Sequence, residues 1–268
     1  MDTRPSGALL LDALESGDVR VAEPVSASRA DKGHSWRVNT WVKEAILELF
    51  RSSASVAMGP GSASALWPFV DKETLPMRRF DPSAGVRVVP GGTSVRRGAY
   101  LGPGVVLMPP AYVNVGAYVG ARSMIDSHAL VGSCAQIGAG VHLSAGAQIG
   151  GVLEPVGSRP VIIEDDCLIG GQSGIYEGVL VGAGAVLAAG VLLTASTRVY
   201  DLVHEVELEG SREEPLAIPP RAVLVPGARP ARGDWAAERG LDLACALIVK
   251  YRDASTDAAV ALEEALRP

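Results

Sequence analysis

Aliphatic residues recur at every sixth position through the central part of this chain. The series begins at Val89 and, after an interruption around residues 155–160, resumes at Ile163 and ends at Val199. Its members are Val89, Val95, Leu101, Leu107, Val113, Val119, Ile125, Val131, Ile137, Leu143, Ile149, Ile163, Ile169, Ile175, Val181, Leu187, Leu193 and Val199. This period matches neither an α-helix, which repeats every 3.6 residues, nor a single alternating strand. The sequence therefore predicts a fold that stacks one six-residue motif.

Glycine often follows the aliphatic residue, and the chain has 31 glycines but only 3 phenylalanines. Because glycine tolerates the positive φ of a sharp corner, we interpret each hexad as a short strand followed by a corner. Three hexads close one triangular coil with the aliphatic residues inside, so eighteen hexads give six coils. At about 4.8 Å between stacked strands, the coils form a prism roughly 30 Å tall. The glycines in question are Gly102, Gly120, Gly132, Gly138, Gly150, Gly170 and Gly182.

The segments on either side of the repeat have other patterns. Helical spacing of apolar residues predicts one helix at 7–16 and a second at 42–50, the latter capped by Asn39 or Thr40, and a Ser/Gly/Ala-rich stretch at 52–64 predicts a mobile loop. We expect Ile218-Pro219-Pro220 to end the coils, with a strand at 245–251 and a short helix at 256–266 beyond them. The predicted domains are a helical domain at 1–85, the repeat at 86–227 and an extension at 228–268.

Composition excludes several classes of protein. A net charge of −6 gives no general attraction to nucleic acid or anionic membranes. We find neither a signal-peptide pattern nor a long apolar run, so we expect a cytoplasmic location. Three cysteines without metal-ligand spacing are interpreted as small buried hydrophobes, and no metal site is expected. Motifs of kinases, hydrolases and dinucleotide-binding enzymes are missing from the sequence.

Several sequence runs point to one family. In the repeat and beyond they are RVVPGG (87–92), YVNVGAYVG (112–120), VGSCAQIGAGVHLSAG (131–146), IGGVLEP (149–155), VIIEDDCLIG (161–170), STRVYD (196–201) and CALIVK (245–250), and in the helical domain WVKEAILELFR (41–51). Together they resemble tetrahydrodipicolinate N-succinyltransferases, which are hexapeptide-repeat acyltransferases. The resemblance implies a mainly β fold, a left-handed parallel β-helix, assembled as a homotrimer. It also implies succinyl transfer from succinyl-CoA, a co-substrate rather than a bound cofactor, to the amino group of ring-opened tetrahydrodipicolinate.

Acyl transfer to an amine needs a group that takes the amine's proton, because an ammonium of pKa about 10 is mostly unreactive at pH 7. Carboxylates suit this role. Asp126 follows the inward Ile125 in the stretch MIDS, which resembles the family segment bearing a catalytic acid, so we assign it as general base. The alternative is an Asp that only caps its turn. Glu177 is the second catalytic candidate.

Binding roles are assigned to residues near the corners. Arg96, Asn114 and Ser144 lie in or beside family-like runs and are candidates for the substrate carboxylates. Backbone N–H groups of Gly-rich corners suit the thioester and its oxyanion, and the candidates are Gly146, Gly151 and Gly190. Arg221 and Lys250 are candidates for the phosphates of coenzyme A. Residues 151–159 are expected to reach toward a neighbouring subunit and cover the site, while His128 and His142 are interpreted as packing or surface residues.

The chain also departs from the family. Gln172 and Gly174 stand where enterobacterial-type relatives have Arg and Glu. Losing a cation near the acyl pocket favours acetyl over succinyl, so acetyl-CoA-dependent transfer in a specialised, tabtoxin-like pathway is one alternative. A β-helix scaffold without catalysis is the other, and Asp126 argues against it.

Overall fold

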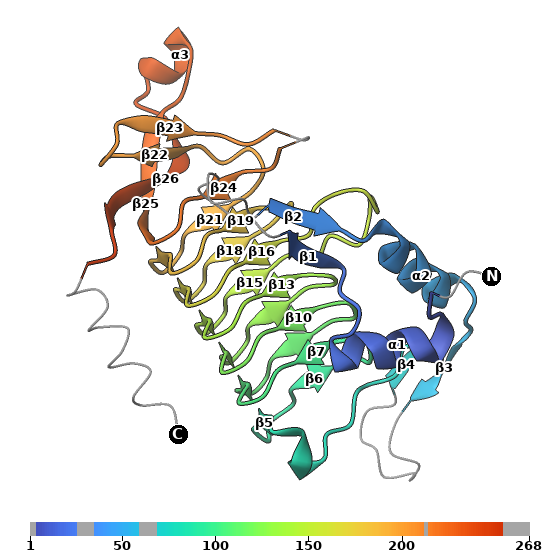
Figure 1. The fold of residues 1–268 in the computed structure, drawn as a ribbon. Helices are drawn as coiled ribbons and strands as arrows, with labels where there is room; N and C mark the ends of the chain where they lie inside the picture. Colours follow the sequence, from blue (N-terminus) through green and yellow to red (C-terminus); the bar gives the residue numbers. More distant parts are fainter. Residues whose placement is uncertain (1–3, 26–34, 59–68, 212–213, 254–268) are drawn as a thin grey trace.

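The hexads form a three-sided prism in the computed structural model, which describes residues 4–25, 35–58, 69–211 and 214–253 (Figure 1). The first face contains β5 (Arg87–Val88), β8 (Val106–Leu107), β11 (Met124–Ile125), β14 (His142–Leu143), β17 (Leu168–Ile169) and β20 (Val186–Leu187). The second contains β6 (Ser94–Val95), β9 (Tyr112–Val113), β12 (Leu130–Val131), β15 (Gln148–Ile149), β18 (Gly174–Ile175) and β21 (Leu192–Leu193). The third contains β7 (Tyr100–Leu101), β10 (Tyr118–Val119), β13 (Gln136–Ile137), β16 (Ile162–Ile163), β19 (Leu180–Val181) and β24 (Ala217–Ile218). The six coils and the left-handed parallel β-helix are confirmed.

Aliphatic side chains of the series fill the inside of the prism. Each residue pairs with its counterparts one coil away, as Ile125 does with Leu107 and Leu143, and all three side chains are fully buried. Burial of one such side chain stabilises the fold by about 1.5–3 kcal/mol, so the inward column is the main source of stability.

The first hexad of the series is misplaced by one residue. Val88, not Val89, pairs with Leu107, because the turn at residues 90–92 contains one residue more than the other turns. The predicted inward position of Val89 is therefore wrong.

The last hexad of the series lies outside the prism. The chain leaves the coils after β21 and returns at β24, so that Ile218 rather than Val199 pairs with Val181. Val199 is still fully buried, but in β22 (Val199–Asp201), which pairs with β23 (Val206–Leu208) and β26 (Asp242–Tyr251).

Glycines that follow the aliphatic residues do not make the corners. The positive φ falls two residues later in the hexad, at Gly104 and Gly116 but also at non-glycine residues such as His128 and Gln172. The earlier glycines instead allow successive coils to stack closely: a Cβ at Gly132 would lie 2.3 Å from the backbone nitrogen of Gly151. Our explanation by positive φ is wrong for these positions, and close backbone approach accounts for them.

The segment before the prism, which we call the helical segment, contains both predicted helices and four short strands. Its elements are α1 (Gly7–Ser16), β1 (Ala22–Val25), β2 (Ser35–Val38), α2 (Thr40–Arg51), β3 (Ser55–Met58), β4 (Phe69–Lys72) and the 3-10 turn η1 (Pro82–Ala84). The loop expected at 52–64 is wrong where β3 pairs with β4, and residues 59–64 lie outside the described residues. Asn39 precedes α2 but its side chain makes no cap, since its amide donates to the carbonyl of Arg20 and to Glu23.

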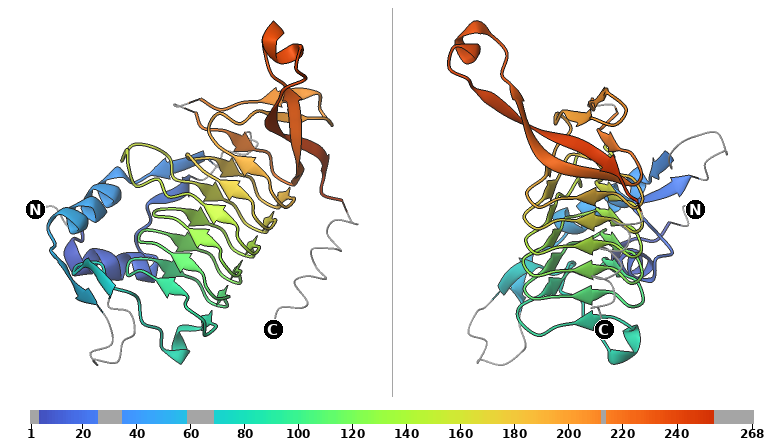
Figure 2. Two further views of the ribbon diagram at one scale, coloured as in Figure 1. Left: turned by 180° about the vertical axis from the view of Figure 1, so that it is seen from behind. Right: turned by 90° about the vertical axis from the view of Figure 1, so that its left-hand side faces the viewer.

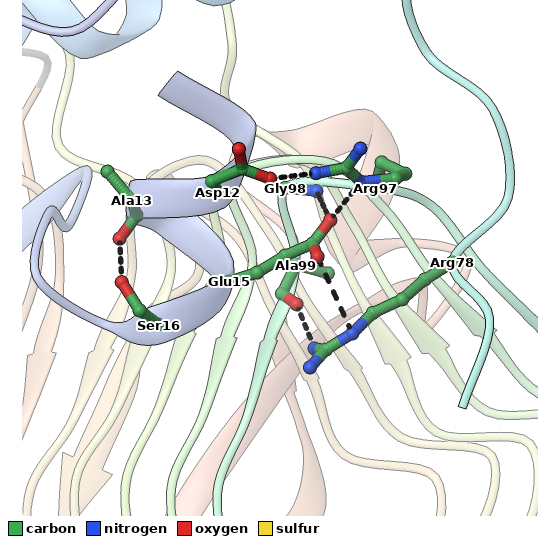
Figure 3. Close-up of polar contacts among 8 residues, drawn as sticks. All are labelled: Asp12, Ala13, Glu15, Ser16, Arg78, Arg97, Gly98 and Ala99. Atoms are coloured by element: carbon green, nitrogen blue, oxygen red, sulfur yellow. Dashed lines mark hydrogen bonds and ion pairs between the residues drawn. The ribbon is translucent and has the colours of Figure 1, made fainter. Parts of the chain in front are cut away.

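Apolar and charged contacts fix this segment to the prism. Its cluster of Leu10, Leu11, Leu14, Val21, Val42, Ile46, Leu49 and Leu75 includes Val115 and Cys134 from two corners. Figure 3 shows the charged contact, in which Glu15 of α1 accepts hydrogen bonds from Arg97 Nε at 2.7 Å and from the N–H of Gly98 at 2.8 Å. Arg78 Nε lies 3.8 Å from the same carboxylate and Asp12 also pairs with Arg97.

After β24 the chain adds one more strand to the first face and then extends away from the prism. Ala222–Leu224 still belong to the coils, because β25 (Ala222–Pro230) pairs with β20, so the prediction that Ile218-Pro219-Pro220 ends the coils is wrong. β25 and β26 form a long hairpin with α3 (Asp234–Ala237) at its tip (Figure 2). The strand predicted at 245–251 is confirmed within β26, whereas the helix predicted at 256–266 lies outside the described residues. Among the described residues, no helix is long and apolar enough to span a membrane.

Candidate active site

Corners of successive coils stack into three edges. The open edge, between the first and second faces, comprises residues 108–111, 126–129, 144–147, 170–173 and 188–191. The covered edge, between the second and third faces, comprises residues 96–99, 114–117, 132–135, 150–161 and 176–179, and the helical segment packs on it. Arg221 lies on the third edge. The predicted site residues are thus divided among all three edges.

Asp126 lies on the open edge with its side chain 31% exposed. Its Oδ1 accepts a hydrogen bond from the N–H of Ser127 at 2.6 Å, which is the turn-capping contact that we considered as an alternative role. Its Oδ2 lies 3.9 Å from Nε2 of His142. The Asp126 carboxylate therefore caps its turn with Oδ1 and directs Oδ2 toward an imidazole, and a partly exposed carboxylate of this kind can accept a proton.

His142 was interpreted as a packing or surface residue, and it is buried beside Asp126. The strand register explains why: Met124 pairs with His142, and Asp126 follows Met124 by two residues on the same side of the strand. An offset of one coil in the sequence could have revealed this pairing.

Three further candidates share the open edge with Asp126. Ser144 and Gly146 lie one coil from it, and Gly190 lies in the last coils. The N–H of Gly146 donates to the carbonyl of Ser127 at 2.8 Å and that of Gly190 to the carbonyl of Gly171 at 2.9 Å. Both N–H groups thus donate to a neighbouring coil in this structure. The structure therefore gives the oxyanion role no support at either glycine, and contact of these corners with the cofactor stays a prediction.

Glu177 and Gly151 line a cavity of about 1640 Å³ on the covered edge. Its wall combines the external loop, which we define as residues 150–161, with Trp36 and Val38 of the helical segment and with the excursion between β21 and β24. Glu177 Oε2 accepts a hydrogen bond from the N–H of Ala195 at 3.0 Å. The carboxylates in the lining are Glu154, Glu177, Glu207, Glu209 and Glu214. Arg159 also lines the cavity, where its guanidinium donates to the carbonyls of Gly178, Pro215 and Leu216, and Arg198 pairs with Glu207 and Glu209.

Arg96 and Asn114 lie on the covered edge, but both serve the fold there. Arg96 forms an ion pair with Asp71 and donates from Nε to the hydroxyl of Tyr112 at 3.2 Å, and only 11% of its side chain is exposed. Asn114 Oδ1 accepts from the N–H of Val115 at 2.8 Å. Neither lines the cavity, so the structure offers no support for their assignment to substrate carboxylates.

The two candidates for the phosphates of coenzyme A lie apart from both acids. Arg221 donates to the carbonyl of Arg252 at 2.9 Å, and Lys250 Nζ lies 3.3 Å from Asp253. Lys250 is in β26, directly opposite Val223 of β25. The structure thus brings these two cations to one side of the prism and does not bring them to Asp126 or Glu177.

The cysteines and the possible metal ligands give a simpler result. All three cysteines are buried, as predicted, and burial raises the pKa of the Cys134 and Cys167 thiols to about 12. They are therefore poor nucleophiles at neutral pH. Across the described ranges, His, Cys, Asp and Glu side chains form no group of three or more that could hold a metal ion.

Comparison with known proteins places the chain in a family. Residues 8–51 match a family described as "Tetrahydrodipicolinate N-succinyltransferase N-terminal", and residues 160–195 match "Hexapeptide repeat of succinyl-transferase". A protein of Methylorubrum extorquens named 2,3,4,5-tetrahydropyridine-2,6-dicarboxylate N-succinyltransferase is 42% identical over 96% of this chain and 87% of its own length. Proteins of the same name from Nitrobacter hamburgensis and Xylella fastidiosa are 45% and 44% identical, over 96% and 98% of this chain and 87% and 88% of their own lengths.

The chain belongs to the tetrahydrodipicolinate N-succinyltransferase family. This confirms the resemblance drawn from the sequence runs. The match in residues 8–51 spans the two helices α1 and α2, which lie outside the coils. The likeness to this family therefore extends beyond the hexapeptide repeat.

Within this member of the tetrahydrodipicolinate N-succinyltransferase family, the two catalytic candidates cannot meet. Asp126 lies on the open edge and Glu177 on the covered edge, with the second face of the prism between them. One chain therefore carries two separate candidates: a partly exposed carboxylate on the open edge, and a cavity walled by a loop on the covered edge.

Proposed function

We propose that this chain transfers the succinyl group of succinyl-CoA to the amino group of ring-opened tetrahydrodipicolinate, a step of lysine and diaminopimelate biosynthesis. The observation that carries the proposal is the near-full-length identity, above 40%, to relatives named for this reaction. The partly exposed carboxylate of Asp126, in the segment that resembles the family's catalytic one, is consistent with it.

In the proposed reaction the amine attacks the thioester carbonyl directly. Asp126 takes the proton that the attacking nitrogen loses, the C–N bond forms, and the tetrahedral intermediate collapses by breaking the C–S bond. The coenzyme A thiolate leaves and is protonated. A backbone N–H near the carbonyl oxygen stabilises the intermediate, and Gly151 is the remaining glycine candidate, since its N–H donates no hydrogen bond within the described residues.

We further propose that the working form is a homotrimer with its sites between subunits. The division of the acids supports this, because the open edge of one chain must meet the covered edge of another if Asp126 and Glu177 are to act on one substrate. Cyclic symmetry provides such a pairing at every interface of a ring of identical subunits.

The decisive measurement compares kcat/KM for succinyl-CoA and acetyl-CoA, with tetrahydrodipicolinate or 2-aminopimelate as acceptor. The reaction is monitored through the release of the free coenzyme A thiol. A cation that holds the succinyl carboxylate favours succinyl-CoA by about ten- to a hundredfold. Gln172 stands on the open edge, and the resemblance places it where enterobacterial-type members have an Arg, which favours the acetyl donor instead. A clear preference for acetyl-CoA would overturn the succinyl assignment, and no thiol release with either donor would favour a scaffold.

A further inference from the structure

The external loop is a wall of the cavity that interrupts the repeat, and α2 contacts it through Lys43. Figure 1 shows the loop between β15 and β16 reaching toward α2. Glu154, Pro155, Gly157, Ser158 and Arg159 of this loop line the cavity. The position of these residues therefore determines the shape of the proposed site.

Lys43 of α2 makes the polar contact between the helix and this loop. Its Nζ donates a hydrogen bond to the backbone carbonyl of Ser158 at 2.6 Å. The side chain is fully buried, and that burial lowers the pKa of the ammonium. Among the described residues, no carboxylate forms an ion pair with Lys43, so the Ser158 carbonyl is its hydrogen-bond acceptor there.

The rest of the loop is held at other points. At its start, the N–H of Val152 donates to the carbonyl of Ser133 at 3.2 Å and Leu153 packs against the apolar cluster of the helical segment. At its end, Arg159 Nε donates to the carbonyl of Gly178 at 2.8 Å. Lys43 contacts the loop between these points, at Ser158, which also lines the cavity.

Filling the space between α2 and the coils does not require an ammonium. A methionine would occupy a similar volume without losing the hydration of a charge, and unpaired buried charges are costly. What the lysine adds is a charge-assisted hydrogen bond to one carbonyl, which is both short and directional. The contact therefore specifies where Ser158 lies rather than whether the segments pack.

We propose that Lys43 is a positioning residue for the reaction: it holds the external loop in the arrangement that binds substrate in the cavity. This rests on the proposed function. Without the Lys43 contact the loop samples other arrangements, and binding must select the competent one. The apparent KM then rises in inverse proportion to the competent fraction, while kcat at saturation is largely kept because bound substrate reorders the loop.

The test compares Lys43→Met with Lys72→Met. Lys72 is half-buried and makes the same type of contact elsewhere in the helical segment, since its Nζ donates to the carbonyl of Ser53 at 2.8 Å, and it does not line the cavity. For Lys43→Met we expect faster amide hydrogen exchange in residues 150–161 of the free protein. We also expect a KM for at least one substrate that is raised roughly tenfold, with kcat within about threefold of wild type. Lys72→Met should change neither the exchange of the loop nor KM.

Unchanged exchange of residues 150–161 in a folded Lys43→Met protein would overturn the proposal. So would faster exchange with unchanged KM, because the loop would then not serve catalysis. If Lys43→Met does not fold, Lys43→Gln removes the charge and shortens the side chain while keeping it polar, and it should show the same pattern to a smaller degree. A wild-type protein without thiol release would remove the proposed function, whereas the exchange measurement would still decide whether Lys43 holds the loop.

Discussion

The open and covered edges of the prism have the same repeat but differ in what surrounds them. Corners of the open edge, such as His128 and Gln172, are exposed and carry no further segment within the described residues. Corners of the covered edge are packed under the helical segment and lead into the external loop and the excursion after β21. The open edge presents a carboxylate, and the covered edge presents a cavity.

This difference teaches how a uniform scaffold acquires a site. A stack of identical coils exposes no pocket, because each coil contacts only its neighbours and every edge is a straight column. Insertions into one edge create concavity there, and the edge without insertions remains able to meet another surface. The asymmetry therefore favours a site completed by pairing unlike edges from two chains.

The largest effect is expected for Asp126→Asn on the open edge. If Asp126 takes the proton of the amine, turnover should fall by roughly 10²-fold or more, since general-base assistance is typically worth 10²–10⁴. Binding of coenzyme A should stay near normal, as measured by calorimetry. Glu177→Gln should cost less unless that residue has replaced the acid missing at position 174. Near-normal turnover of Asp126→Asn would reject the general-base assignment.

A second experiment tests whether the two edges come from different chains. Asp126→Asn and Glu177→Gln chains, unfolded together and reassembled in equal amounts, should regain activity. If each site takes one edge from each of two subunits, about a quarter of the sites contain both native acids. The test requires that each variant alone has lost most of its activity. Activity no higher than the mean of the separately reassembled variants would then show that one chain supplies both groups. Light scattering should report about three chains per particle.

Much of the prism could be predicted because the cause of its period is local. Every Val, Leu or Ile in the series fills the same inward position, so the step of six specifies the strands, the faces and the coil number. The series itself is wrong at its two ends, Val89 and Val199, where the step of six extends by chance beyond the regular coils. The turn after Val89 has an additional residue, and Val199 is buried in a different sheet.

The candidate site was less predictable because its contacts join segments that no period relates. Asp126 was found through the resemblance of its stretch to a family segment. The partnership of Lys43 with Ser158 had no signal, since nothing in the residues around either one indicates the other. His142 had a signal in the offset of one coil, because strand pairing relates residue i to residue i+18 in the coils before the external loop.

The smallest effects are expected for Gly→Ala substitutions at one glycine on each edge, measured as changes in unfolding free energy. Gly190 on the open edge has φ +77° and nothing within 4 Å of an added Cβ, whereas Gly116 on the covered edge has φ +73° and would place its Cβ 3.0 Å from Ile46 and 3.1 Å from Val21. Gly190→Ala should cost about 1 kcal/mol of unfolding free energy, because only the left-handed backbone opposes a side chain. Gly116→Ala carries the same backbone cost plus overpacking of about 1–3 kcal/mol. Denaturant unfolding at one protein concentration measures both, and equal losses would mean that the helical segment does not press on the covered edge.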